Sequence, residues 1–239
     1  MKSFDTIRKR AAERKGGEDV LASLLGPKPE NKALSNVPDD RILSTMAERV
    51  FSAGFVWRVI QQKWPGFEEA FLGFEPKRLL FQPEDFWHDL ASDTRIVRNP
   101  QKIKSVRDNA AFVDRISQEH GSFGTFLAKW PADDQAGLIE FLGKHGSRLG
   151  GNTGQYFLRW IGWDSYIVSG DMLAALRDAG LEVSEKASSK SDRARIQARL
   201  NQWAAETGLP YVHLSRILAM SIGPNRTPEE IRHYVGDGE

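Results

Sequence analysis

Hydrophobic residues recur at three- and four-residue spacing along most of the chain, which is the period of an amphipathic helix. After Asp39, the apolar residues Ile42, Met46 and Val50 share one helical face, and the pattern ends near Gly54. Strict two-residue alternation, which marks a half-buried strand, is almost absent. The pattern therefore predicts an all-α fold.

Caps and helix breakers predict where helices begin and end. Asn99 followed by Pro100 is a favourable start, because the asparagine can accept a hydrogen bond from the first turn and proline fits the first helical position. Asp39 or Asp40 can cap the helix that follows them, and Pro65 is expected to end the next one. Further helices are predicted at about 4–15, 18–25, 170–179, 191–207 and 212–221.

The predicted elements fall into three consecutive parts. We expect a helical N-terminal arm and loop over residues 1–38, a main helical domain over residues 39–223 and a C-terminal tail over residues 224–239. A chain of 239 residues can bury one good core or form two small lobes that share a cleft.

Residues 144–176 carry the clearest chemical signal in the main domain. A helix meets a glycine-rich corner, the hairpin at 146–154, and a second amphipathic helix follows. Glycines permit positive φ, and the N–H groups that open a helix are unpaired and positively polarised. No acidic residue lies between Glu140 and Asp164, whereas Arg148 lies in the corner. The segment predicts a phosphate contact; the alternative is a tight corner whose glycines serve geometry alone.

Composition limits the functions that need testing. The net charge of +1 means that a nucleic-acid surface must come from local clusters of basic residues. The hairpin region is one such cluster, and residues 95–107, which contain no acid, form a second. The chain has no cysteine, which excludes disulfides and thiolate metal sites and fits a reducing compartment. The charged N-terminus lacks the apolar core of a signal peptide, and no run is long enough to cross a bilayer. We expect a soluble, cytoplasmic protein.

Three segments in the same order resemble the DNA-3-methyladenine glycosylase I family of the helix-hairpin-helix DNA glycosylase superfamily. Gly-Asn-Thr at 151–153 is similar to the Gly-Thr-Thr hairpin of that family. Ala-Gly followed by a tryptophan, at 53–57, is similar to the family's Ala-Gly and pocket tryptophan. The segment RIVRNPQKIKSVRDNA, at 95–110, is similar to the family's Ile-Ile-Arg, Lys-Ile and Asn-Ala segment. The resemblance covers roughly residues 39–176.

The resemblance implies a two-lobed helical glycosylase fold and a defined reaction. A DNA glycosylase flips a base out of the duplex and hydrolyses its N-glycosidic bond, here that of an alkylated purine such as 3-methyladenine, in base excision repair. Such a base is cationic, and an aromatic ring attracts it by about 0.5–2 kcal/mol. We place Trp57, Phe51, Phe55 and Asp164 at the base pocket; the alternatives are a core role for Trp57 and a loop-turn role for Asp164.

Three residues are candidates for catalysis. In most of the superfamily an aspartate opens the helix after the hairpin, and here Ser169 holds that position while Asp171 lies two residues on. Asp171 can stabilise the oxocarbenium-like sugar or merely complement the helix dipole, and Ser169 is most simply an N-cap. The family also uses a glutamate four residues before its Ala-Gly. That position is Arg49, and its neighbour Glu48 can replace the glutamate only if the helix is locally rewound.

The expected partner is double-stranded DNA containing alkylated bases, bound by a monomer. The candidate DNA-binding groups are hairpin residues and nearby cations: Arg98, Lys102, Arg148, Gly150, Gly151, Asn152, Thr153 and Gly154. We expect no cofactor beyond a monovalent cation that the resemblance allows at the hairpin, and no zinc, because the family's cysteine-containing segment is absent. Gln155 and Tyr156 stand where bifunctional relatives place lysine, which favours hydrolysis alone.

Two other classes of function stay open. Arg49 and Ser169 replace both expected acids, which is compatible with a non-catalytic helix-hairpin-helix module that binds DNA. A helical protein-interaction or RNA-binding domain is the third possibility.

Overall fold

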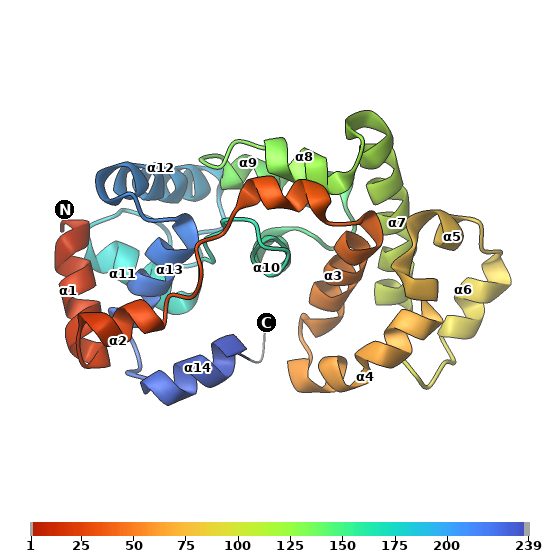
Figure 1. The fold of residues 1–239 in the computed structure, drawn as a ribbon, viewed down its shortest axis with the longest axis horizontal. Coiled ribbons are helices and arrows are strands. Elements are labelled where there is room, and N and C mark those ends of the chain that lie inside the picture. The colour runs from red at the N-terminus through yellow and green to blue at the C-terminus, as the bar shows by residue number, and fades with distance from the viewer. Residues whose placement is uncertain (1, 237–239) are drawn as a thin grey trace. The chain divides into compact units, whose positions relative to one another are not determined.

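A computed structural model describes residues 2–236, and within this range it contains helices and no strand (Figure 1). The predicted all-α fold is confirmed. The elements are α1 (Phe4–Lys15), α2 (Glu18–Ser23), the 3-10 helix η1 (Asn31–Asn36), α3 (Asp39–Ser52), α4 (Trp57–Ala70), the 3-10 helix η2 (Leu72–Phe74), α5 (Pro76–Leu80), α6 (Glu84–Leu90), α7 (Pro100–His120), α8 (Phe123–Lys129), α9 (Gln135–His145), α10 (Gly151–Trp160), α11 (Gly170–Asp178), α12 (Lys190–Thr207), α13 (Tyr211–Met220) and α14 (Pro228–Gly236).

The chain forms two compact units. Unit 1 combines the N-terminal residues up to Glu30 with residues 132–136 and the chain from Asp164 onward. Unit 2 combines residues 31–131 with residues 137–163 and so contains the hairpin. This grouping differs from the predicted succession of arm, domain and tail, because α1 packs against α13 from the other end of the chain.

The core of unit 1 is built from helices far apart in sequence. Phe4 of α1 contacts Trp203 of α12, with ring centroids 5.4 Å apart. Tyr166 joins two other elements, because its hydroxyl donates to the Gln197 side chain at 2.9 Å and its N–H donates to Gln135 at 2.7 Å. Burial raises the pKa of the Tyr166 hydroxyl above its ordinary value.

An aromatic cluster forms much of the core of unit 2 and explains why α4 is longer than predicted. Pro65 lies inside α4, so the prediction that it ends the helix is wrong. The helix continues because Trp64 and Phe67 stack at 4.9 Å and Phe67 packs edge-on against Phe51 at 4.7 Å. This packing outweighs the cost of a helix-interior proline, about 3 kcal/mol.

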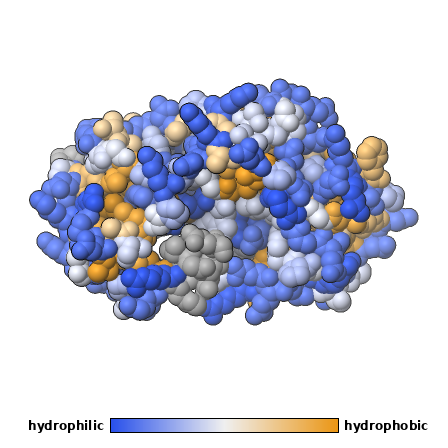
Figure 2. Space-filling model, viewed as in Figure 1, coloured by the Kyte–Doolittle hydropathy of each residue, from blue (hydrophilic) through white to orange (hydrophobic). Residues whose placement is uncertain are grey.

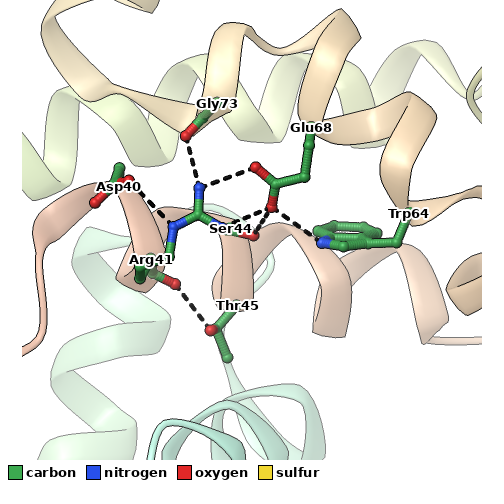
Figure 3. Close-up of polar contacts among 7 residues, drawn as sticks. All are labelled: Asp40, Arg41, Ser44, Thr45, Trp64, Glu68 and Gly73. Atoms are coloured by element: carbon green, nitrogen blue, oxygen red, sulfur yellow. Dashed lines mark hydrogen bonds and ion pairs between the residues drawn. The ribbon is translucent and has the colours of Figure 1, made fainter.

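A charged clamp joins α3 to α4 and η2 (Figure 3). Arg41 donates two hydrogen bonds to the Glu68 carboxylate, both 2.9 Å, and a third to the Gly73 carbonyl at 2.9 Å. Ser44 and Trp64 also donate to Glu68, at 2.7 and 3.2 Å. Burial by itself raises the pKa of Glu68, but the hydrogen bonds from Arg41 and Ser44 outweigh burial and hold that pKa below its ordinary value.

Two predicted helix starts have different outcomes. The Asn99 side chain accepts a hydrogen bond from the Lys102 N–H at 3.1 Å, and Pro100 is the first residue of α7, as predicted. Pro38 is the N-cap of α3, without a side-chain cap bond, so the predicted capping by Asp39 or Asp40 is wrong. The Asp39 carboxylate instead accepts from the N–H of Phe123 at 2.9 Å, because long-range packing brings the start of α8 to it.

The face drawn in Figure 2 is mostly hydrophilic, with separate hydrophobic patches. Within residues 2–236, no helix combines the length and the apolar character needed to cross a membrane.

Candidate functional site

The hairpin in unit 2 is held by a buried side chain to which the sequence analysis gave no role, although it lies in the matched segment 95–110. Asn109 of α7 accepts from the Ser147 N–H at 2.7 Å and donates to the Ser147 carbonyl at 3.0 Å. Only 1% of Asn109 is exposed. The available signal was a polar residue on an otherwise apolar helical face, between Val106 and Val113. Asn109 therefore fixes the corner between α9 and α10.

The corner presents free helix-terminal amides. Arg148 and Gly151 have positive φ values of 61° and 57°, which turn the chain sharply before α10. Gly150 is the N-cap of α10 and supplies no side-chain hydrogen bond, and the first turn of α10 contains no acid. The N–H groups of this first turn therefore carry the partial positive charge of a helix N-terminus, which favours an anion.

A cavity of about 260 Å³ lies beside these amides, and its lining contains two cations and no acid. The lining residues are Val50, Ala53, Lys102, Arg148, Gly150 and Thr153. The structure thus brings together four of the predicted DNA-binding residues: two from the hairpin corner, one from α10 and one from α7. Arg98 is exposed and does not line this cavity.

Lys102 is more deeply buried than a lysine that binds phosphate at a protein surface would be. Its ammonium donates to the carbonyls of Phe51 and Ala53, at 3.0 and 2.7 Å, and only 6% of the residue is exposed. Burial, followed by repulsion from Arg148, lowers the pKa of Lys102. Lys102 therefore fastens the end of α3 to α7 while adding positive charge to the cavity.

The turn between α3 and α4 carries the predicted pocket aromatics, and they differ in exposure. Trp57 is half-buried at the start of α4, with the Arg58 guanidinium 5.5 Å from its ring centroid. Phe55 is 46% exposed, and the Lys102 ammonium lies 4.8 Å from its ring centroid, which puts Phe55 beside the hairpin cavity. Phe51 is fully buried among core rings and does not face solvent, because the apolar face of α3 points into unit 2.

Glu48 and Arg49 form an ion pair in the last turns of α3. The guanidinium carbon of Arg49 lies 4.5 Å from the ring centroid of Trp160 in α10, and 9% of the Arg49 side chain is exposed. Burial lowers the pKa of Arg49, and the neighbouring Glu48 opposes that shift. Glu48 is thus engaged with its neighbour rather than standing as a solvated helix acid.

The other predicted site residues, Ser169, Asp171 and Asp164, belong to unit 1. Ser169 accepts from the Met172 N–H at 3.1 Å and is the N-cap of α11, as expected of its simplest role. Asp171 follows in the first turn of α11, with the Arg226 guanidinium 3.9 Å away. The Asp164 carboxylate accepts from the N–H groups of Tyr211 and Val212 at 3.0 and 2.9 Å, so it caps α13.

Metal ligation has little support among the described residues. Within residues 2–236, no group of three or more His, Cys, Asp or Glu side chains could hold a metal ion. Thr153, which carries a hydroxyl, lines the hairpin cavity, and a monovalent cation there stays a prediction.

Comparison with known proteins adds to this geometry. A model of the methyladenine glycosylase family matches residues 35–138. The 8-oxoguanine glycosylase/lyase of Methanocaldococcus jannaschii, solved with a 15mer DNA containing 8-oxoguanine, is 17% identical, with a TM-score of 0.51 over 90% of this chain and 95% of that one. The 3-methyladenine DNA glycosylase I of Staphylococcus aureus is 24% identical, with a TM-score of 0.48 over 53% of this chain and 77% of that one.

The family match places a segment similar to methyladenine glycosylases at residues 35–138, and the similarity to the 8-oxoguanine glycosylase/lyase shows that the two chains share an all-α fold. The family match agrees, over residues 35–138, with the resemblance to the DNA-3-methyladenine glycosylase I family inferred from the sequence.

Proposed function

We propose that this protein is a DNA glycosylase that excises a modified purine from double-stranded DNA by base flipping and simple hydrolysis. The observation that carries the proposal is the hairpin cavity, where unpaired amides, Lys102 and Arg148 surround a space of about 260 Å³ without a carboxylate. A backbone phosphate fits this combination of partial and full positive charge. The hairpin would therefore hold the strand without reading its sequence.

The exposed turn beside the cavity supports the flipping step. Phe55, Val56 and Val59 are 46%, 65% and 41% exposed, an unusual concentration of apolar surface in one turn. Apolar side chains of this kind insert between base steps and unstack them, and an aromatic ring then receives the base. Trp57, half-buried in the same turn, is the proposed pocket aromatic.

Hydrolysis needs stabilisation of an oxocarbenium-like sugar. Asp171 is the proposed carboxylate, because it lies in the first turn of the helix that follows the hairpin helix. The residues after the hairpin are Gln155 and Tyr156 rather than a lysine, which supports a monofunctional hydrolase without Schiff-base chemistry. The family resemblance favours alkylated purines as the substrate class.

The test is release of free base from duplexes that each carry one purine lesion. The native protein is expected to release base under single-turnover conditions, and Trp57→Ala and Asp171→Asn are expected to reduce the rate at least tenfold. Asp164→Asn is the matched control, because that carboxylate caps α13. No release from any lesion by the native protein refutes the enzymatic proposal.

A non-catalytic DNA-binding module is the second candidate. It is favoured by Ser169, which caps α11 where most of the superfamily has the catalytic aspartate. That function predicts salt-dependent duplex binding with no base release and equal affinity for intact and damaged DNA.

A further inference from the structure

A cavity of about 180 Å³ lies within unit 1, and we call it the unit 1 cavity. Three cations line it: Lys15 of α1, Arg216 of α13 and Arg226 of the loop before α14. Among the described residues that line it, Asp171 is the one acid. With these four side chains ionised, the lining carries an excess of two positive charges. None of its lining residues belongs to the hairpin cavity, so the two cavities are distinct.

Uncharged acceptors hold two of the three cations in place. The Lys15 ammonium donates to the side-chain oxygen of Asn225 at 2.9 Å and to the Arg226 carbonyl at 2.7 Å. The Arg216 guanidinium donates to the carbonyl of Leu25. These contacts position the charges without neutralising them.

The charges around Lys15 repel one another. Only 5% of Lys15 is exposed, and burial, followed by repulsion from Arg14 and Arg226, lowers its pKa, while Glu230 opposes that shift. The Asp171 carboxylate lies 3.9 Å from the Arg226 guanidinium, which is beyond hydrogen-bond distance. An anion bound in the cavity would relieve this repulsion.

Hydrogen bonds to α1 fix the loop that carries Arg226. The Arg14 guanidinium donates to the carbonyls of Met220 and Gly223, at 3.1 and 2.6 Å. The Asn225 side chain in turn donates to the Arg14 carbonyl at 3.1 Å. A site that is ordered in this way loses less conformational freedom when a ligand binds.

The rest of the lining and the charge excess together indicate the class of ligand. Much of the remaining wall is apolar, with Leu24, Met220, Pro224 and Ile231. Such a wall accepts an apolar or aromatic body, while a few charged groups fix the polar end. Guanidinium forks bind phosphate oxygens in pairs. A phosphate monoester, with a second pKa of about 6, is close to a dianion at neutral pH, so it matches the charge excess better than a carboxylate does.

We propose that the unit 1 cavity binds a small phosphate monoester. The phosphate faces Lys15, Arg216 and Arg226, and the apolar body lies against the apolar wall. This second ligand site goes beyond the proposed function, which places a DNA phosphate at the hairpin of unit 2, and it does not depend on base release.

Calorimetry with phenyl phosphate, which joins a phosphate to an apolar ring, tests this site in the full chain. The native protein is expected to bind phenyl phosphate at least tenfold more tightly than benzoate, which has the same ring and a single charge. Arg226→Gln removes one cation, and Ala219→Leu fills the cavity while every charge stays in place; each is expected to weaken binding at least tenfold. Lys9→Gln, which removes an exposed charge of α1 paired with Asp5, is expected to keep the native affinity.

Two further measurements separate this cavity from the hairpin and from effects on folding. Arg148→Gln is expected to keep the native affinity for phenyl phosphate, because Arg148 lines the hairpin cavity instead. Phenyl phosphate is expected to raise the thermal midpoint of the native protein but not that of folded Arg226→Gln. The inference is overturned by an absence of native binding, by equal affinity for phenyl phosphate and benzoate, or by unchanged affinity in folded Arg226→Gln or Ala219→Leu. A tenfold loss in Arg148→Gln would also overturn it.

Discussion

Replacing Gly154 with alanine tests whether the hairpin geometry is as tight as the structure indicates. Gly154 lies in the first turn of α10, and a Cβ there would stand less than 3.0 Å from the backbone carbonyl oxygen of Leu149. It would also stand 3.1 Å from Cδ1 of Ile139. Because a backbone atom cannot rotate away, the hairpin or α10 must move.

The expected change in the free energy of unfolding of Gly154→Ala follows from two opposing contributions. Alanine is favoured over glycine in a helix by about 1 kcal/mol. Overpacking a close contact costs ~1–3 kcal/mol, and the backbone overlap at Leu149 belongs at the upper end of that range. The net effect is a loss of about 1–2 kcal/mol in the free energy of unfolding, or about 2–8 °C in the thermal midpoint for a chain of this size.

Thermal unfolding and duplex binding should be measured together with two control variants. Gly170→Ala places its Cβ in open space, so it is expected to be neutral or slightly stabilising. Gly151→Ala also meets no neighbour, but its φ of 57° makes it a probe of backbone strain alone, worth about 1–2 kcal/mol. If Gly154→Ala equals Gly170→Ala in both stability and duplex affinity, the close packing of α10 on the hairpin is refuted.

Three further predictions concern other parts of the two units. Glu68→Gln should cost about 1–3 kcal/mol at pH 7, measured by urea unfolding, because it breaks the charged clamp with Arg41. The folded-state pKa of Glu68 is below its ordinary value of 4.5, so its contribution is present above that pH and is lost as the pH falls through the folded pKa. Asp164→Ala should cost ~0.5–2 kcal/mol, the value of a lost helix cap, without slowing base release by the folded protein. Arg148→Ala should weaken duplex binding and reduce the slope of log affinity against log salt concentration by about one.

Each of these predictions has a contradicting result, and those for Glu68 and Arg148 also have a matched control. Glu69→Gln removes a carboxylate that is 70% exposed, so it should barely change stability, and an equal loss for both glutamates would contradict the clamp. Slower base release by folded Asp164→Ala would contradict a purely structural role for Asp164 and would support its predicted place in the base pocket. An unchanged salt slope for Arg148→Ala, matching that of the exposed control Lys9→Ala, would mean that no phosphate lies near Arg148.

Local signals in the sequence predicted local structure well. Asn99 with Pro100 and Ser169 marked helix starts correctly, because a cap depends on the few residues that follow it. The prediction that Pro65 ends α4 was wrong, because the packing energy that keeps α4 helical comes from Trp64 and from rings that lie in other turns and helices. The prediction that Asp39 caps α3 was wrong for the same reason, since its hydrogen-bond partner is the start of α8, far along the chain.

For the candidate site, the sequence indicated the glycine-rich corner and the cations Lys102 and Arg148, but not the contacts that the charged side chains make. The glycine-rich corner could be found because glycine and the absence of acids are visible residue by residue. The burial of Lys102 could not be predicted from the sequence, because it depends on where the carbonyls of Phe51 and Ala53 lie. The hydrogen bonds of Asn109 to Ser147 likewise depend on how α7 packs against the hairpin. The contacts of Arg49 with Glu48 and Trp160 depend on how α3 packs against α10.

The packing of α1 against α13 bears on how the protein is made. A ribosome adds roughly 5–20 residues per second, so the nascent chain carries α1 for on the order of ten seconds before α13 emerges. Unit 2 draws its residues from an earlier and nearly uninterrupted stretch and can close first. Until α12 and α13 emerge, the buried face of α1, with Phe4, Ile7 and Ala11, is left without its native cover and is a site where a chaperone can bind.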